Sequence, residues 1–479
     1  MMERTPMFDI LLPETDDRPI YLQLYAQIRT LIRDGSIPDG ARLPSVRALR
    51  QQLNISKTPI ENAYQMLTAE GYAVSRPRSG LYASNPPPAS STTSGGISPP
   101  VQSGIGPAAD ASFAGLIDFD PTRLDHGAFP LRIWQKMLRD ALDNNSGRLG
   151  GYGDPRGEPG LRQSIAEYLG SARGVQCVPD QIVVGSGMAY SIGIVAKLLA
   201  GRRRVAMEEP GYNLVRDQLL LGGCEVQPVP VGDKGLRLDA LAAADVQAVY
   251  ITPSHQFPTG SIMPYPERER LLVWAKAKDA YVIEDDYDGE FRYVGKPIPS
   301  LQGLDMHARV IYIGTFSKAF TPAVRLNYMV LPPALCERLA RMPHEVLHAP
   351  SRVEQWAMQS FISQGHWFRH VRKMRSLYRK RHRHLIELIQ SLLGDRVEVT
   401  GQNAGLHLQL TVKGGSSAER LVEAAASVGV KVYDLRKMWA DQRQPASVAP
   451  KLYFGFASLR PEEMEAGIRL LAKAWGEEL

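Results

Sequence analysis

Hydrophobic residues near the start of the chain recur every three or four positions, a spacing that predicts short helices with one buried face. The first predicted helix covers Ile20–Arg33. The second begins after Ser45, whose side chain can cap it, and places Val46 and Leu49 on one face. Both helices are expected to pack into one small core.

A third predicted helix follows a short turn. In the string T-P-I-E at Thr58–Glu61, the threonine can cap the helix, the proline suits its first position, and the glutamate can complete a capping box. The helix should end at Gly71, and two short strands, Tyr72–Ser75 and Leu81–Ala83, should follow. Three helices and a hairpin predict a winged helix-turn-helix over residues 17–85.

The pattern changes after residue 85. Residues 86–115 are mostly Pro, Gly, Ser, Thr and Ala, and such a segment cannot bury enough apolar surface to fold. We therefore expect a flexible linker at residues 86–115, between the small module and a body over residues 116–479.

In the body, apolar β-branched runs alternate with helical stretches, which predicts an α/β fold with many parallel strands and helices on both faces. The expected strands are Gln181–Val184, Val205–Met207, Val226–Val231, Ala248–Thr252, Tyr281–Ile283, Val310–Ile313 and Tyr328–Leu331. Polar clusters follow several of these strands, at the edge where open α/β sheets bind their ligands.

The composition limits the kinds of partner, metal site and cellular location that we expect for this protein. The 479 residues include 56 Lys or Arg and 50 Asp or Glu, and the net charge of +6 permits a nucleic-acid partner without requiring one. The three cysteines are widely spaced, which excludes a disulfide framework and a thiolate zinc site, and we expect no metal site. Because neither a signal peptide nor a membrane span is visible, we expect no membrane partner and a cytoplasmic protein, nucleoid-associated when bound to DNA.

Basic residues of the small module fall where DNA would lie. Arg47 starts the second helix, Lys57 precedes the third, and Arg76 and Arg78 are in the wing. Such charges are typical of phosphate contacts, although a solvated basic face would have the same pattern.

The string LPSVRAL…LNISKTPIENAYQMLTAEGYAVSRPRSGLYAS resembles the DNA-binding domain of GntR-type bacterial repressors. The resemblance implies a double-stranded DNA operator as the partner of this module. The candidate DNA contacts are Ser45, Arg47, Ser56, Lys57, Thr58, Asn62, Tyr64, Arg76, Arg78 and Gly80.

Three clusters in the body carry candidate chemistry. A Gly-Ser-Gly turn at 185–187 opens a helix whose first amides suit a phosphate, YVIEDDYDGEF ends a strand in two acids, and Lys318 lies in the apolar string VIYIGTFSKAF. Each alone has an ordinary explanation as a turn, a loop acid or a surface lysine. Together, an imine-forming lysine, a carboxylate and a phosphate cup are what pyridoxal phosphate requires.

The strings GYGDPRGEPGLRQSIAEYL, SGMAYSIGIVAKLL, EEPGY, TPSHQFPTG, IEDDYDGEF and GTFSK resemble, in order, those of fold-type-I aminotransferases, and the likeness spans nearly all of the body. It implies a mostly parallel sheet plus a smaller α+β subdomain. Lys318 would form the Schiff base and Asp285, or alternatively Asp286, would pair with the pyridine nitrogen. Tyr287 would donate to the phenolic oxygen and Tyr212 would stack on the ring. The phosphate would be bound by Ser186, Gly187, Met188, Thr315, Ser317 and Arg325.

Two positions depart from that family's pattern. Phe257, with His255 and Gln256 just ahead, stands where an asparagine usually binds the phenolic oxygen, and Tyr453 stands where an arginine usually binds the substrate carboxylate. A tyrosine cannot replace a bidentate guanidinium, so both changes argue against an efficient transaminase. The arginines that could substitute are Arg216, Arg436, Arg443 and Arg460.

The segment Arg369–His384 holds eight Lys or Arg, three His and no acid. It could be a second DNA contact, but we favour one face of a long helix with apolar residues packed beneath it.

A GntR-like winged helix joined to an aminotransferase-like body resembles the MocR/GabR-type bacterial regulators. The resemblance implies a homodimeric, pyridoxal phosphate-dependent transcription factor that senses a small amine or amino acid through an external aldimine at Lys318. The alternatives are an active transaminase with a fused DNA-binding domain and a sensor of pyridoxal phosphate itself.

Overall fold

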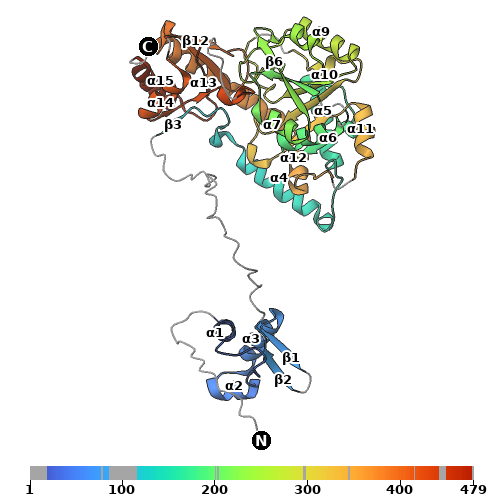
Figure 1. The fold of residues 1–479 in the computed structure, drawn as a ribbon, viewed down its shortest axis with the longest axis vertical. Helices are drawn as coiled ribbons and strands as arrows, with labels where there is room; N and C mark the ends of the chain where they lie inside the picture. Colours follow the sequence, from blue (N-terminus) through green and yellow to red (C-terminus); the bar gives the residue numbers. More distant parts are fainter. Residues whose placement is uncertain are drawn as a thin grey trace. The chain divides into compact units, whose positions relative to one another are not determined.

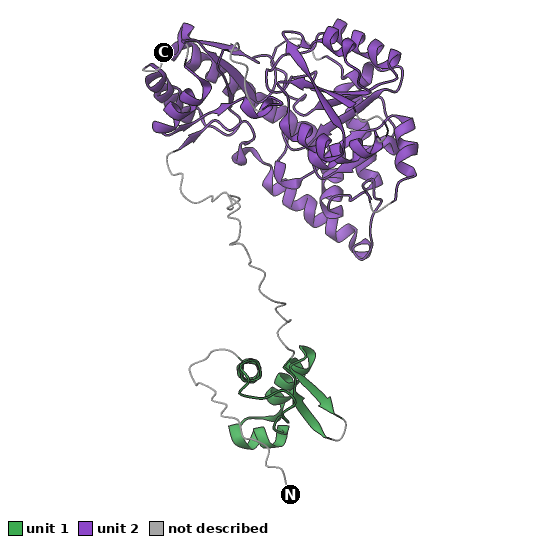
Figure 2. Cartoon of the chain, viewed as in Figure 1, with its two compact units in different colours: residues 1–111 green, residues 112–479 purple. Residues whose placement is uncertain are grey.

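The computed structural model describes residues 19–76, 79–85, 116–199, 201, 204–294, 298–343, 346–414, 416–441 and 449–476. The chain divides into two units, residues 1–111 and residues 112–479 (Figure 2). The expected linker at residues 86–115 lies outside the described residues, as do Arg78 and Arg443. Within the described residues, no helix is both long enough and apolar enough to cross a bilayer.

The small unit is a winged helix-turn-helix, as predicted (Figure 1). Its elements are α1 (Ile20–Arg33), α2 (Val46–Leu53), α3 (Lys57–Ala69) and the antiparallel strands β1 (Ala73–Arg76) and β2 (Gly80–Ala83). Leu24, Leu49, Ile60 and Leu67 are completely buried between them. The apolar stripes seen in the sequence therefore form one core.

The helix starts of this unit test the capping predictions. The Ser45 hydroxyl accepts a hydrogen bond from the Ala48 amide at 3.1 Å, which confirms the predicted cap of α2. The prediction for α3 is wrong, because α3 begins at Lys57 with Ser56 before it, and not after Thr58. Pro59 occupies the third position of the helix, where it is tolerated because first-turn amides have no partner within the helix.

An eight-stranded sheet forms the centre of the large unit. Its strands are β4 (Ile182–Gly185), β5 (Arg204–Glu209), β6 (Glu225–Gly232), β7 (Gly235–Leu236), β8 (Ala248–Ile251), β9 (Tyr281–Asp286), β10 (Val310–Thr315) and β11 (Asn327–Val330). The spatial order is β4-β11-β10-β9-β8-β5-β6-β7, and β10, β9, β8, β5 and β6 are mutually parallel. All seven predicted strands are present, and the predicted α/β class is confirmed.

Helices cover both faces of this sheet because neighbouring residues of a strand point to opposite sides. Along β10, Ile311 and Ile313 pack in the core that contains α6 and α7, whereas Tyr312 packs in the core that contains α5 and α12. The helices of this unit are α4 (Leu131–Asn144), α5 (Pro159–Arg173), α6 (Met188–Leu198), α7 (Asn213–Leu221), α8 (Leu238–Ala243), α9 (Tyr265–Ala277), α10 (Leu301–Leu304), α11 (Pro333–Ala340), α12 (Arg352–Ser363), α13 (His366–Leu392), α14 (Ala418–Ser427) and α15 (Pro461–Gly476).

A smaller subdomain lies at one end of the large unit, where β12, α14 and α15 are drawn in orange to red in Figure 1. Its four-stranded sheet has the order β12-β13-β16-β15, and β3 pairs with β14 beside it. The strands are β3 (Ile117–Asp118), β12 (Val397–Thr400), β13 (His407–Val412), β14 (Val430–Lys431), β15 (Tyr433–Asp434) and β16 (Lys451–Gly455). The predicted α+β subdomain is thus present.

The basic segment Arg369–His384 lies within the 27-residue helix α13. Val371, Met374, Tyr378 and Leu385 are buried on its inner face. The preferred prediction of a helix with a packed apolar face is confirmed.

Candidate functional site

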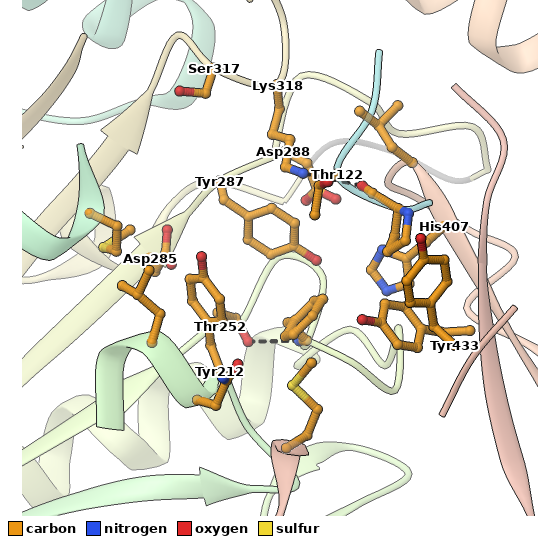
Figure 3. A pocket seen from close by; sticks show the side chains of 18 of the residues that line it. Thr122, Tyr212, Thr252, Asp285, Tyr287, Asp288, Ser317, Lys318, His407 and Tyr433 are labelled. Atoms are coloured by element: carbon orange, nitrogen blue, oxygen red, sulfur yellow. Dashed lines mark hydrogen bonds between the residues drawn. The ribbon is translucent and has the colours of Figure 1, made fainter. Parts of the chain in front are cut away.

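A cavity of about 750 Å³ opens at the carboxyl ends of the parallel strands (Figure 3). Its lining comes from the segments after β5, β8, β9 and β10, from the start of α6, and from β13, β15 and β16 of the smaller subdomain. It therefore lies where the sequence predicted a ligand site and takes in both parts of the large unit.

Lys318, just after β10, is a half-buried amine in this cavity. Its Nζ donates a hydrogen bond to the Pro121 carbonyl oxygen at 3.2 Å. Burial lowers the pKa of Lys318, and the nearby carboxylates of Asp288, Asp120 and Asp285 only partly oppose that effect. A lysine with a lowered pKa is more often neutral, which makes it a better nucleophile toward a carbonyl carbon.

Asp285, on β9, is a buried carboxyl group that forms no ion pair among the described residues. The Tyr250 hydroxyl donates to its Oδ2 at 2.5 Å, and its Oδ1 has no hydrogen-bond partner among the described residues. Burial raises the pKa of Asp285 to about 8. A protonated ring nitrogen opposite Oδ1 would supply the missing donor and the missing charge.

Asp286, the next residue, has its partners within the protein. The guanidinium of Arg173 donates to its two carboxylate oxygens at 2.6 and 3.0 Å, and the Tyr312 hydroxyl donates at 2.7 Å. Burial alone would raise the pKa of Asp286, but Arg173 and these hydrogen bonds hold it below its usual value. Asp285 lines the cavity and Asp286 does not.

The turn before α6 and the segment after β10 meet at one end of the cavity. Gly187, Met188, Thr315, Ser317 and Arg325 line it, whereas Ser186 does not. Gly187 has a φ of +125°, which favours glycine, and a Cβ atom there would come within 2.5 Å of Arg325 Nη2 and displace this guanidinium.

The Gly187 amide is already engaged, because it donates to Asn327 Oδ1 at 3.0 Å. That this amide binds phosphate stays a prediction, and an anion there would have to share the amide hydrogen with Asn327. The remaining first-turn amides of α6, which begin at Met188, have no partner within the helix and can take an anion. Ala189, which the sequence analysis did not select, also lines the cavity there.

An aromatic wall closes the cavity toward the smaller subdomain. Phe257 lies with its ring centroid 5.4 Å from that of Tyr212 and 6.1 Å from that of Tyr453. In Figure 3 the ring of Tyr287 stands between Asp285 and His407. Two further polar residues that the sequence analysis gave no role, Asp288 and His407, also line the cavity.

The candidate substitute arginines differ in position. Arg436 lines the cavity and forms ion pairs with Asp434 at 2.7 Å and Glu419 at 3.3 Å. Arg216 and Arg460 do not line it; Arg216 donates to backbone carbonyls near residue 438, and Arg460 pairs with Glu463. Of the described candidates for a substitute arginine, Arg436 is thus the one that can meet a ligand in the cavity.

The small unit presents most of its candidate DNA contacts on the surface. Arg47, Ser56, Lys57, Thr58 and Asn62 are exposed, and so are Ser45, Arg76 and Gly80. The Arg76 guanidinium lies 4.3 Å from the centroid of the Tyr82 ring, and Lys57 pairs with Glu61 at 2.8 Å.

Tyr64 corrects the prediction of a base contact. Its side chain is buried, and its hydroxyl donates to the Pro44 carbonyl oxygen at 2.7 Å. It shares the apolar stripe of Ile60 and Leu67 and belongs to the core. Sequence reasoning missed Arg42, an exposed residue whose guanidinium lies beside Gly80 in the wing.

Two protein families match the chain. Residues 120–442 match the family described as aminotransferase class I and II, and residues 20–82 match the gntR family of bacterial regulatory proteins. The first match contains Lys318 and Asp285, and the second contains all three helices of the small unit.

Relatives and solved structures agree with these matches. The uncharacterized HTH-type transcriptional regulator YhdI of Bacillus subtilis is 39% identical over 99% of this chain and 98% of its own length. The probable rhizopine catabolism regulatory protein MocR of Rhizobium meliloti is 33% identical over 97% of this chain and 96% of its own. A crystal structure of Pyrococcus horikoshii kynurenine aminotransferase in complex with PMP has a TM-score of 0.69 at 24% identity, over 76% of this chain and 92% of that one. The likeness to that structure shows the fold.

Proposed function

The chain belongs to the MocR-type transcriptional regulators, which join a gntR-family DNA-binding domain to an aminotransferase class I and II domain, and from this premise we propose that it is a pyridoxal phosphate-dependent sensor of a small amine or amino acid. The observation that carries the proposal is the pair formed by Lys318 and Asp285. One is an amine with a lowered pKa and the other a carboxyl group whose Oδ1 lacks a partner, and both face one cavity.

The residues of the cavity fit the cofactor. When bound, pyridoxal phosphate supplies an aldehyde carbon that condenses with a primary amine. Lys318 would hold that carbon, Asp285 the pyridine nitrogen and Tyr287 the phenolic oxygen, and Tyr212 would stack on the ring. The phosphate would be held by Met188 and the first turn of α6, with Thr315, Ser317 and Arg325.

The chain's own residues determine which amines are accepted. Phe257 and Tyr453 make the region beyond Lys318 apolar and aromatic, and neither can anchor a carboxylate in the bidentate manner of an arginine. Arg436 is the candidate anchor, although Asp434 and Glu419 already compete for its guanidinium. An effector would regulate the protein by binding two states of the body unequally.

We propose a homodimer as the active form. Leu131, Leu142, Leu149 and Tyr152, on α4 and the segment after it, are exposed apolar or aromatic side chains. Clusters of this kind on a folded unit are typical of interaction surfaces. A dimer would bring two winged helices to paired half-sites on double-stranded DNA.

The experiment is an absorbance titration of the purified protein, loaded with pyridoxal phosphate, against a panel of amines and amino acids with and without a keto acid. We expect a saturable spectral change with the effector and no consumption of the keto acid. Sustained consumption would establish the transaminase alternative. DNA affinity that differs between cofactor-free and loaded protein, with no response to any amine, would establish a sensor of the cofactor itself.

A further inference from the structure

Behind Tyr287 lies a buried pair that the proposed function has not used. His255 Nδ1 is 2.8 Å from Asp288 Oδ2 and 3.1 Å from the Tyr287 hydroxyl oxygen. His255 is 1% exposed and Asp288 is 2% exposed. His255 follows β8 and Asp288 follows β9, and these strands are parallel neighbours, so the sheet itself brings the two side chains together.

The carboxylate determines which atom carries the imidazole proton. Two acceptors, Asp288 Oδ2 and the Tyr287 oxygen, face His255 Nδ1, so a lone pair on Nδ1 would oppose the carboxylate lone pairs without solvent to separate them. A hydrogen on Nδ1 satisfies both acceptors, whether the ring is neutral or cationic. The Tyr287 hydroxyl then accepts from His255, and its own hydrogen is left for Asp288, with which it also interacts, or for a ligand in the cavity.

The packing around His255 holds its ring in contact with Asp288. At Gly405, where φ is +78°, a Cβ atom would overlap the imidazole and come within 2.6 Å of Asp288 Oδ2. The ring of His407 contacts that of His255, with 4.8 Å between centroids and the two planes tilted by 41°. Burial lowers the pKa of His407 well below its usual value, so this neighbour is neutral and brings no charge.

Phe257, which stands where the aminotransferases usually have an asparagine, suggests a role for the pair of Asp288 and His255. The phenyl ring has no donor for the phenolic oxygen of the cofactor, which leaves that oxygen to Tyr287 in the proposed function. We propose that Asp288 and His255 are positioning residues that keep the Tyr287 hydroxyl in the donor orientation toward the cofactor's phenolic oxygen. This inference rests on the proposed function and assigns it two further residues.

Other titratable groups face this cluster. Asp285 and Glu208 act on Tyr287, Lys318 acts on His407, and His382 of α13 faces His255. His255, Asp288 and His407 also have ligand atoms within 4.8 Å of one another, an arrangement that suits a divalent cation. We favour the hydrogen-bonded pair because Asp288 Oδ2 and His255 Nδ1 already face each other at hydrogen-bond distance.

The test measures the pH midpoint of the absorbance change of the bound cofactor. A donor on the phenolic oxygen stabilises its deprotonated form, so Tyr287→Phe should raise the midpoint by about one pH unit. Asp288→Asn should act through Tyr287, because it removes the carboxylate that holds the hydrogen on His255 Nδ1. In the other tautomer the Nδ1 lone pair becomes an acceptor of the Tyr287 hydrogen. Removal of the Asp288 charge alone would lower the midpoint.

The two effects are separated by a double-mutant cycle. Asp288→Asn changes the pH midpoint of the absorbance change in both backgrounds. This change should be about one pH unit more positive when Tyr287 is present than when it is replaced by phenylalanine. Asp120→Asn is the matched control, because Asp120 also acts on Lys318 but has no contact with His255 among the described interactions, and it should shift the midpoint equally in both backgrounds. Equal shifts for Asp288→Asn in the two backgrounds would overturn the proposal. So would a midpoint that moves after exhaustive treatment with EDTA, which would assign the cluster to a metal.

A second measurement needs no cofactor. Two-bond proton–nitrogen spectra of ¹⁵N-histidine-labelled protein, with His255→Asn to identify the signals, report which ring nitrogen carries the hydrogen. We expect the His255 ring to carry its hydrogen on Nδ1 in the wild type and on Nε2 in Asp288→Asn. An unprotonated His255 Nδ1 in the wild type would overturn the proposal. Failure of the proposed function is distinguishable, since the wild type would then carry no borohydride-trapped cofactor mass at Lys318 whatever the histidine spectra show.

Discussion

The winged helix of the small unit and the cavity of the large unit use their functional residues in different ways. In the small unit, candidate contacts such as Arg47 and Asn62 are exposed, while a separate set of residues forms the core. In the large unit, the two candidate acids are buried and already bonded to other residues of the fold, Asp285 to Tyr250 and Asp286 to Arg173. Binding and folding should therefore be separable in the small unit and coupled in the large one.

We expect the largest effect from Lys318→Ala, which tests whether cofactor binding in the large unit and DNA binding in the small unit are independent. Lys318→Ala removes the amine that we propose holds the cofactor; the other lysine of the cavity lining, Lys437, is exposed and lies in the smaller subdomain. After borohydride reduction, mass spectrometry should find no cofactor mass on the chain, while affinity for a DNA duplex of arbitrary sequence should not change. A variant that still traps the cofactor covalently would contradict the assignment of Lys318.

Asp286→Asn should show the coupling of site and fold most clearly. The substitution leaves the buried guanidinium of Arg173 without its carboxylate, and breaking such a pair costs about 3–5 kcal/mol of stability. Chemical unfolding of the large unit, followed by tryptophan fluorescence, measures the change. Asp285→Asn is the matched control, and an equal loss in both variants would contradict the distinction between the two acids.

The difference between the units also explains what the sequence could and could not predict. Local patterns predicted both ends of α1 and the start of α2 to the residue, and the family strings predicted that Lys318 and Asp285 share one site; both line one cavity. The burial of Tyr64 was visible in principle, because Tyr64 follows Ile60 by one helical turn and so shares its face.

Contacts between distant parts of the chain could not be predicted in this way. The partner of the Gly187 amide is Asn327, 140 residues further on, and nothing in either local sequence indicates the contact. The pairing of His255 with Asp288 depends on which strands are neighbours in the sheet, an arrangement that the order of strands along the chain does not determine. Non-local hydrogen bonds of this kind decide which groups remain available to a ligand.

Asp285 should make the stability of the cofactor-free protein depend on pH. Burial raises its pKa to about 8, so between about pH 4 and pH 8 the folded state holds a proton that the unfolded chain has released. This contribution to stability is fully present below about pH 4 and is lost as the pH rises toward 8, at up to about 1.4 kcal/mol per pH unit. Unfolding free energies at several pH values should therefore fall more steeply in the wild type than in Asp285→Asn. Glu284 and Glu290 titrate in both proteins and cancel in the comparison, whereas Glu208 is coupled to Asp285 and contributes to the difference.

Arg47→Ala should weaken DNA binding without a change in the fold. If Arg47 contacts a phosphate, the slope of log affinity against log salt should fall by about 0.9 for a duplex of arbitrary sequence. Arg469→Ala, on the exposed side of α15, removes the same charge from the large unit and should leave the slope unchanged. Equal losses in the two variants would mean that net charge, and not a contact in the small unit, governs the affinity.

We expect the smallest effect from Tyr64→Phe, which tests which residues of α3 belong to the core and which contact DNA. Tyr64→Phe removes the hydrogen bond to Pro44 and should lower the stability of the small unit by about 1 kcal/mol, measured in the full chain as faster hydrogen exchange of α3 amides. DNA affinity should not change, because the ring stays in the core. Asn62→Ala, two residues away and exposed, should do the reverse: weaken binding and leave exchange as it is. If Tyr64→Phe lowered DNA affinity while the hydrogen exchange rates of α3 amides stayed the same, Tyr64 would be a DNA contact after all. Folding and binding would then not be separable at this residue of the small unit.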